Sequence, residues 1–216
     1  MKVVTFTYSE NYDELEGLAC NAFILIDDLN QCVIVDPSKD NNSYIDYINR
    51  NNLTPKAILI THTHFDHIRG VPTLYNEYKI PVYVHVEDIP GLTDPYKNCS
   101  SLLRNNKMVI NVKPSPVLDN DIIDVLDEPI KVIHTPYHTV GSVCYYLRDS
   151  NIIFTGDTLF YRSIGRDDFA TSLRYKGYQS FKKIMSLPED TKAYTGHGPV
   201  TYIGEEKKYN TFIKSL

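Results

Sequence analysis

The 216-residue chain lacks both long hydrophobic segments and a cationic leader. Its apolar runs, such as residues 22–26, are far shorter than the roughly 20 residues needed to cross a bilayer. The start of the chain has one lysine and no uninterrupted apolar segment after it, so it does not resemble a signal peptide. These absences argue against a membrane protein and predict a cytoplasmic one.

Positive charge and paired cysteine motifs are also scarce. The chain has 22 Lys and Arg against 27 Asp and Glu, a net charge of −5, whereas nucleic acids and anionic membranes attract positive charge. We therefore expect neither a nucleic acid nor a membrane as a partner.

The four cysteines form no CxxC pair, so we expect reduced thiols rather than a disulfide framework. They are Cys20, Cys32, Cys99 and Cys144.

The remaining composition is that of an ordinary globular protein, with 42% hydrophobic and 23% charged residues. The length predicts a single domain over residues 1–216. Apolar patterns predict strands at 2–8, 22–26, 31–35, 57–60, 82–84, 122–125, 130–134, 143–147, 152–155 and 193–195. They predict helices at 43–50, 71–79, 173–187 and 204–214. Residues 88–113 have no clear pattern, and the two halves, each a sheet with helices, suggest a four-layer sandwich.

The segment THTHFDH at residues 61–67 directly follows the predicted strand 57–60. It supplies three imidazoles and one carboxylate within six residues, namely His62, His64, Asp66 and His67. This mixture of nitrogen and oxygen ligands suits zinc, iron or manganese. A short segment cannot complete a metal site alone, and His138, Asp157 and His197 each follow another predicted strand and turn. The spacing therefore predicts a metal site at strand ends.

Six segments carry a resemblance to a known family. They are VDP at 35–37, THTHFDH at 61–67, HTPYHTVGS at 134–142, FTGDTLF at 154–160, GRDDF at 165–169 and GHGP at 196–199. In these segments the chain resembles the metallo-β-lactamase superfamily, in particular its short glyoxalase II-like hydrolases. The resemblance implies an α/β (α+β) fold, a four-layer αββα sandwich with the metal site at one edge of the two sheets.

The resemblance also implies a role for each candidate ligand in a centre of two divalent metal ions. Zinc is the first expectation, and iron and manganese are alternatives. One ion would be held by His62, His64 and His138, the other by Asp66, His67 and His197, and Asp157 would bind both. A hydroxide bridging the ions would attack the substrate, with Asp66 and Asp157 as the catalytic side chains and Asp66 orienting the hydroxide.

Three further residues are expected around this centre. Asp36 occupies the position of a carboxylate that orients the ligand histidines in the family. His134 begins the HTP motif and is expected to be structural or to support a ligand. Arg166 either contacts a substrate carboxylate or forms a surface ion pair with Asp168.

The expected activity is hydrolysis of a small thioester, because a thiolate leaves without help from a general acid. An alternative is a persulfide dioxygenase that uses one iron held by His62, His138 and Asp157. A lactone hydrolase and a non-catalytic metal-binding protein are less favoured. A β-lactamase is also disfavoured, because such enzymes are normally exported and do not carry Asp157 at that position. The sequence does not indicate the acyl group, the thiol carrier or the oligomeric state.

Overall fold

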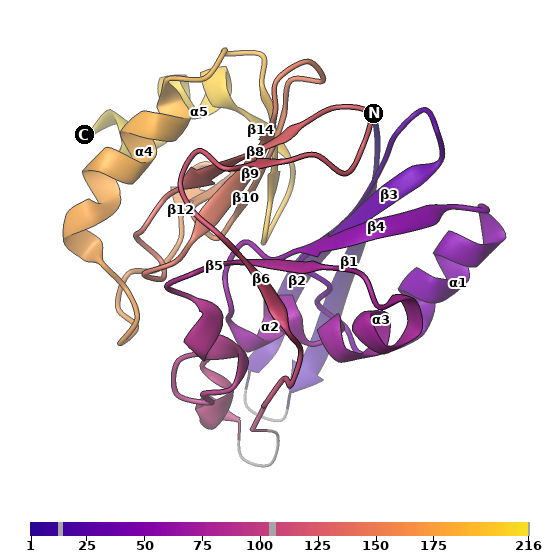
Figure 1. Cartoon of the computed structure of the whole chain (residues 1–216). Coiled ribbons are helices and arrows are strands. Elements are labelled where there is room, and N and C mark those ends of the chain that lie inside the picture. The colour runs from indigo at the N-terminus through magenta and orange to yellow at the C-terminus, as the bar shows by residue number, and fades with distance from the viewer. Residues whose placement is uncertain (13–14, 104–106, 216) are drawn as a thin grey trace.

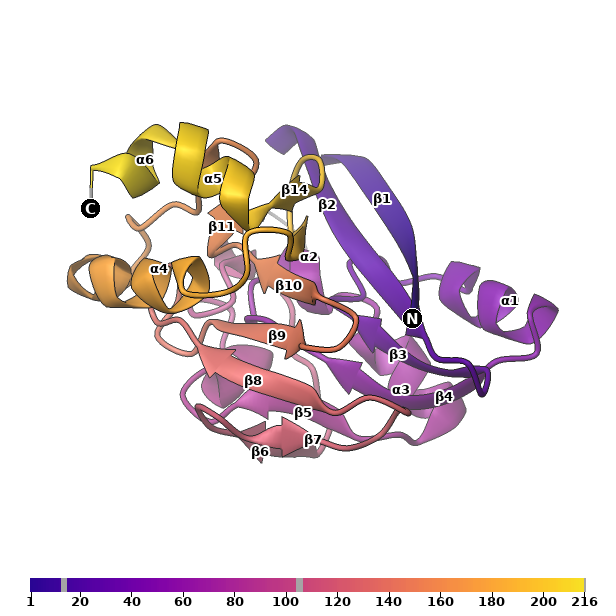
Figure 2. The same ribbon diagram turned by 90° about the horizontal axis from the view of Figure 1, so that it is seen from above.

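Two six-stranded sheets pack face to face in the computed structural model, which describes residues 1–12, 15–103 and 107–215. Figure 1 shows helices α1 and α3 on one outer side of the sheets and helices α4 and α5 on the other. The view from above in Figure 2 shows the same four layers. The expected αββα sandwich is confirmed.

The first sheet has the strand order β1-β2-β3-β4-β5-β6. Its strands are β1 (Lys2–Tyr12), β2 (Leu15–Ile26), β3 (Gln31–Val35), β4 (Thr54–Leu59), β5 (Val82–His85) and β6 (Pro114–Val117). The first three strands are antiparallel, whereas β3 to β6 run parallel. Parallel neighbours need crossover connections, and α1 (Ser43–Arg50) and α3 (Val71–Tyr78) lie within two of them.

The second sheet has the order β14-β13-β10-β9-β8-β7. Its strands are β7 (Ile122–Ile123), β8 (Ile130–His134), β9 (Val143–Leu147), β10 (Ile152–Gly156), β13 (Lys192–Thr195) and β14 (Thr201–Tyr202). Helices α4 (Gly177–Met185), α5 (Ile203–Tyr209) and α6 (Thr211–Lys214) follow in the last part of the chain. A small hairpin of β11 (Leu159–Phe160) and β12 (Ser163–Ile164) stands apart from both sheets.

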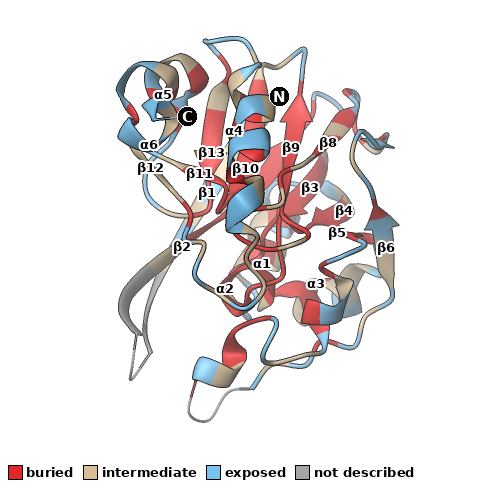
Figure 3. Ribbon diagram, turned by 90° about the vertical axis from the view of Figure 1, so that its left-hand side faces the viewer, coloured by how far each residue is buried: buried red, intermediate tan, exposed pale blue. Residues whose placement is uncertain are grey.

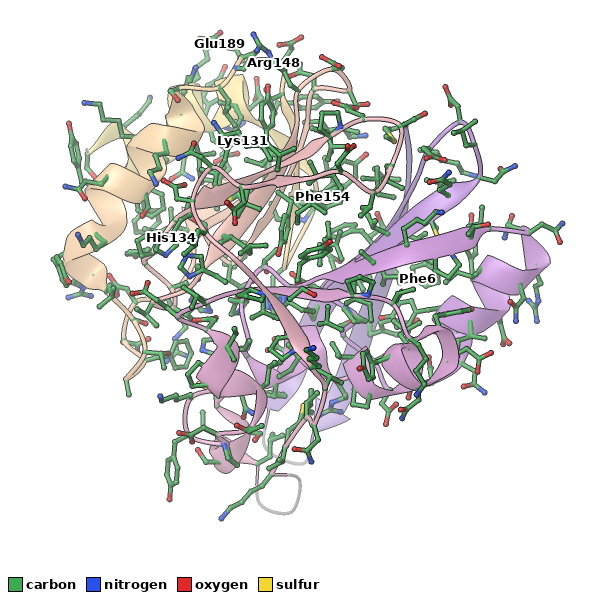
Figure 4. The ribbon with its side chains drawn as sticks, in the orientation of Figure 1. Phe6, Lys131, His134, Arg148, Phe154 and Glu189 are labelled. Carbon is green, nitrogen blue, oxygen red and sulfur yellow. The ribbon has the colours of Figure 1, made fainter. Side chains whose placement is uncertain are left out.

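The central strands are buried on both faces, as Figure 3 shows in red. In β2, Phe23 and Leu25 face the second sheet, while Ala22 and Ile24 face α1 and α3. Phe154 comes from the second sheet and lies between the two, where its ring centroid is 5.2 Å from that of Phe23 (Figure 4). Layers on both sides explain why these strands are near-continuous hydrophobic runs in the sequence.

Most expected elements are present, but several boundaries and short elements differ. The expected helix 173–187 begins as a 3₁₀ turn at Arg174–Lys176 before α4, and residues 88–113 contain two 3₁₀ turns, Ile89–Leu92 and Ser100–Leu102. Strand β6 was not expected, because two of its four residues are proline, which suits only a sheet edge.

The four cysteines are free thiols, and no helix in the described part of the chain is long and apolar enough to cross a bilayer.

The expected helix 204–214 was wrong as one element, because Asn210 divides it into α5 and α6. The Asn210 backbone is extended, and its side chain accepts hydrogen bonds from the amides of Phe212 and Ile213. Its amide nitrogen donates to the Ser163 carbonyl at 3.0 Å and to the buried Glu206 carboxylate at 2.8 Å. An asparagine that caps a new helix therefore overrides the helical pattern.

We predict that Asn210→Ala lowers the free energy of unfolding by about 2 kcal/mol, since it removes a helix cap and a donor to a buried carboxylate. Urea denaturation measures this loss. The exposed Asn76→Ala in α3 is a matched control and should change stability by less than about 0.5 kcal/mol. Equal stability of the two variants would contradict the capping role.

Candidate metal centre

The candidate ligands all follow the carboxyl ends of strands. His62 and His64 lie in the turn after β4, and Asp66 and His67 lie in the short helix α2 (Phe65–Ile68). The other candidates follow β8, β10 and β13, which are parallel to one another in the second sheet. Because parallel strands end at the same edge, residues separated by up to 135 positions (197 − 62 = 135) meet at one place.

The ligand atoms form adjoining groups, in each of which they lie within 4.8 Å of one another. One group is His62, His64 and His138. Another is Asp66, His67 and His197 together with Cys20, and a third links His62, His67 and Asp157. The structure thus brings together all seven residues that the sequence analysis proposed as ligands. It adds Cys20, which belongs to no recognised motif.

Asp157 lies between the groups. Its Oδ2 atom is 3.4 Å from Nε2 of both His138 and His197, and its Oδ1 atom is 3.3 Å from Nε2 of His67. On the side of the second group, Oδ2 of Asp66 lies 3.4 Å from Nε2 of His197. A carboxylate has two oxygens and can contact two ions, so this position suits a bridging ligand.

Hydrogen bonds on the far side of each ring orient the histidines. The Nδ1 atom of His138 donates to the backbone carbonyl of Arg166 at 2.7 Å, and Nδ1 of His197 donates to the carbonyl of Ala19 at 2.7 Å. Nδ1 of His67 lies 3.0 Å from Oδ2 of Asp36. With Nδ1 bound in this way, each Nε2 faces the cluster and offers its lone pair to an ion once the ring is neutral.

Besides His67, Asp36 contacts Thr61, the first residue of the segment that carries the ligands. It is buried, and it accepts hydrogen bonds from the amide and the hydroxyl of Thr61 at 2.7 and 2.6 Å. The Thr61 hydroxyl in turn lies 3.2 Å from Nδ1 of His62. Asp36 therefore lies beside the candidate ligands, as the sequence analysis expected, and it reaches rings in both groups.

The residues present fit a metal centre. Within the described residues, Nε2 of His62 and Oδ1 of Asp157 are buried with no hydrogen-bond partner, and both belong to the group shared with His67. Leaving such atoms unpaired is costly in a protein interior. Imidazole nitrogens and carboxylate oxygens are ligands for zinc, iron and manganese, so metal binding would satisfy these atoms.

Burial and neighbouring charges set the protonation of the cluster. Burial lowers the pKa of His62 well below its usual range and that of His64 to about 3, so both rings are neutral. Burial opposes the charge of His197, but Asp157 and Asp66 raise its pKa to about 12. Without an ion, protonated imidazole balances the buried carboxylates. Metal binding must displace such protons, so it weakens as the pH falls.

Arg166 lies at the rim of the cluster rather than within it. Its side chain is 69% exposed and forms a two-point ion pair with Asp168, with both N–O distances 2.9 Å. Its guanidinium carbon also lies 4.7 Å from the centre of the Phe169 ring. The surface pair considered in the sequence analysis is therefore present, while the backbone carbonyl of Arg166 orients His138.

His134 lies apart from the seven ligand candidates. Figure 4 labels it on the side of the molecule that carries α4, and Lys183 of that helix donates to its carbonyl at 2.8 Å. Its ring stacks on His85 with a centroid distance of 3.9 Å, and its Nε2 atom contacts the carbonyl of Val140. Within the described residues these contacts join His134 to none of the seven, which favours the structural role.

A cavity of about 280 Å³ opens onto the cluster. Five candidate ligands line it, together with Arg166 and side chains that the sequence analysis did not identify, namely Phe65, Cys99, Leu102, Phe160 and Phe169. Cys99 and Leu102 come from the segment without a readable pattern. No motif marks Cys99 and Leu102, and although the three phenylalanines belong to quoted segments, only the folded chain brings all five side chains to the same place.

Comparison with known proteins identifies the family. The model of the metallo-beta-lactamase superfamily matches residues 15–197. The chain belongs to this superfamily. It is 34% identical to a probable metallo-hydrolase, YqgX of Bacillus subtilis, over 92% of this chain and 94% of that protein. It is also 34% identical to the hydroxyacylglutathione hydrolase of Nitrosomonas eutropha, over 76% of this chain but 56% of that protein.

Two solved structures of this superfamily fold are similar along nearly the whole chain. The BLEG-1 B3 metallo-beta-lactamase is 36% identical with a TM-score of 0.87, covering 97% of this chain and 99% of that one. TTHA1623 in a di-iron-bound form is 29% identical with a TM-score of 0.80, covering 96% and 99%. Proteins of this superfamily bind divalent metal ions. Membership therefore indicates a metal-dependent hydrolase.

We predict that Asp36→Asn weakens metal binding by about 10- to 100-fold, because the amide replaces a carboxylate that orients His67 and, through Thr61, His62. Competition with a chromogenic chelator measures the affinity. Glu128→Gln is a matched control, since Glu128 is also a buried carboxylate that accepts backbone hydrogen bonds, but from Asp149 and Ser150 between β9 and β10. An Asp36→Asn protein with the affinity of the control would refute the orienting role.

Proposed function

We propose that the protein is a cytoplasmic hydrolase that cleaves a small thioester at a centre of two divalent metal ions, zinc in the first place. The observation that carries the proposal is the position of Asp157, between two ligand groups that face one cavity. A site with two adjoining ligand groups suits an attack by water on a carbonyl, which needs no side-chain nucleophile.

The chemistry of the cavity favours a leaving group that is stable as an anion. Apart from Arg166 and Cys99, the titratable side chains among its lining residues are the candidate ligands His64, Asp66, His138, Asp157 and His197. Side chains that bind metal ions cannot serve as free general acids. A thiolate, with an ordinary pKa near 8.5, leaves without a proton, whereas an alkoxide or amide anion does not.

The roles of the side chains follow from their positions. Two bound divalent ions would lower the pKa of a water molecule and polarise the thioester carbonyl. Asp66 lines the cavity and can accept a hydrogen bond from the attacking water, while Asp157 holds the two ligand groups together. Phe65, Phe160 and Phe169 line the cavity with apolar surface, which suits an apolar part of the acyl group.

Similarity to named proteins supports the same proposal. One relative is named hydroxyacylglutathione hydrolase, an enzyme of a glutathione thioester, and one similar structure is described as di-iron-bound. The chain spans 56% of the length of that hydrolase.

A dioxygenase requires molecular oxygen, whereas a hydrolase does not. We predict that S-lactoylglutathione or a similar small thioester is cleaved at the same rate under strict anaerobiosis as in air, because water is the only co-substrate. Glutathione persulfide should cause no substrate-dependent oxygen uptake. A thiol-release assay and an oxygen electrode, applied to one preparation, measure both.

Two results would contradict the proposal. The first is oxygen uptake with persulfide and no thioester cleavage, which would support the dioxygenase alternative. The second is hydrolysis of a β-lactam, followed by the change in its ultraviolet absorbance, with no cleavage of any thioester. Asp157→Ala serves as the control protein, since it should bind neither ion firmly and release no thiol.

Arg166 is our candidate contact for a negatively charged group of the substrate, and Asp168 competes for the same edge of its guanidinium group. At this exposed position we predict that Arg166→Ala raises KM for an anionic thioester by about 10-fold, near the lower end for a charge-assisted hydrogen bond. Asp168→Ala should lower KM for the same substrate, because it frees the guanidinium. Steady-state kinetics with a neutral thioester provide the control and should change little. Unchanged KM values in both variants would leave Arg166 with a purely structural role.

A further inference from the structure

Cys20 is the one member of the second ligand group that no motif predicted. It lies on β2 beyond the end of β3, because Phe23 of β2 pairs with Val35, the last residue of β3. There β2 forms a backbone bridge to the turn after β13, in which Cys20 pairs with His197. This brings a strand of the first sheet to the ligands of the second.

The position of Cys20 is held firmly. The amide of the next residue, Asn21, donates to the Gly196 carbonyl at 2.8 Å, and its side chain donates to the carbonyls of Thr195 and Gly198 at 3.0 and 2.8 Å. The carbonyl of the preceding residue, Ala19, accepts the hydrogen bond from His197. Both neighbours of Cys20 therefore fix its backbone relative to a candidate ligand.

The sulfur faces the ligand atoms. Sγ of Cys20 is 3.6 Å from Nε2 of His67, and it lies within 4.8 Å of the ligand atoms of Asp66 and His197. Zinc–sulfur and zinc–nitrogen bonds of about 2.3 and 2.05 Å place the two ligand atoms roughly 3.1 to 3.8 Å apart at bond angles of about 90 to 120°. The observed separation fits two ligands of one ion, and without an ion it is that of a hydrogen bond between the thiol and the imidazole. Cys20 is also only 3% exposed, and outside this cluster its thiol contacts the Asn21 carbonyl oxygen at 3.8 Å.

We propose that Cys20 is a thiolate ligand of the ion held by Asp66, His67 and His197. The inference rests on the proposed two-metal centre and adds one ligand to it. On binding, a sulfur–metal bond forms and the S–H proton passes to water. The two ions then have different surroundings, three imidazoles on one side and a sulfur-containing set on the other. A soft sulfur ligand favours zinc or cobalt over manganese at that position.

Cobalt provides a direct test, because a thiolate bound to Co²⁺ produces an intense charge-transfer band in the near ultraviolet that nitrogen and oxygen ligands do not. The full-length protein is stripped of metal and titrated with Co²⁺, and the spectrum is followed to two ions per chain. We expect the band to appear in the wild-type protein and to be lost in Cys20→Ser. Cys144→Ser is a matched control that should keep the band, since Cys144 is equally buried but contacts Thr135 and Thr155 instead.

Cys99→Ser should also keep the band, which excludes the other thiol at the cavity as its source. In a zinc competition titration, Cys20→Ser should weaken one of the two binding steps by more than about 10-fold, the lower limit for residues that merely orient a ligand. Two bound cobalt ions without the band in the wild-type protein would overturn the thiolate ligand and leave the two-metal centre intact. A single bound cobalt ion without the band would overturn both. Because the wild-type spectrum alone decides between these outcomes, the test does not depend on how well a variant folds.

Discussion

The buried carboxylate of Asp157 is the interaction on which the rest of the site depends. A charge in the interior must be balanced, and here histidines from three different strand ends surround it. The chain passes so close to Asp157 that side chains are not tolerated at two places. A Cβ atom on Gly165 would lie 1.8 Å from the Asp157 carbonyl oxygen, and one on Gly196 would lie 2.3 Å from Oδ1. This packing accounts for Gly165 in the GRDDF segment and for Gly196, the first glycine of the GHGP segment.

The packing of the two sheets against each other brings the candidate ligands together. Neither sheet alone carries the centre, because the first supplies the segment after β4 and the second supplies the turns after β8, β10 and β13. Contacts between the sheets hold the two halves in register at this edge. Tyr145 of β9 donates to the carbonyl of Ile60 at 2.9 Å, and Asn21 of β2 joins the turn after β13. A small shift between the sheets would separate the two ligand groups.

The ligand histidines are supported in two different ways. His138 and His197 donate to backbone carbonyls, which are neutral, whereas His67 lies against the carboxylate of Asp36. A carboxylate partner increases the basicity of an imidazole more than a carbonyl does. The group that contains His67 also contains Asp66, so negative charge accumulates there rather than around the three imidazoles of the other group. The two ligand groups are therefore chemically unequal even before Cys20 is considered.

Local pattern in the sequence was sufficient for the class of fold and for the seven candidate ligands. Strands such as 31–35 and 130–134 are apolar runs that end in turns, and the ligands follow these ends directly, so both signals are local. Tertiary structure decided what depends on contacts between distant segments. Cys20 meets His67 only through the register of β2, and Leu102 reaches the cavity from a segment without periodicity. The helix break at Asn210 likewise depends on side-chain hydrogen bonds, which hydrophobic periodicity does not predict. The ion pair of Arg166 with Asp168 is a local contact, and the sequence had offered it as one of two alternatives.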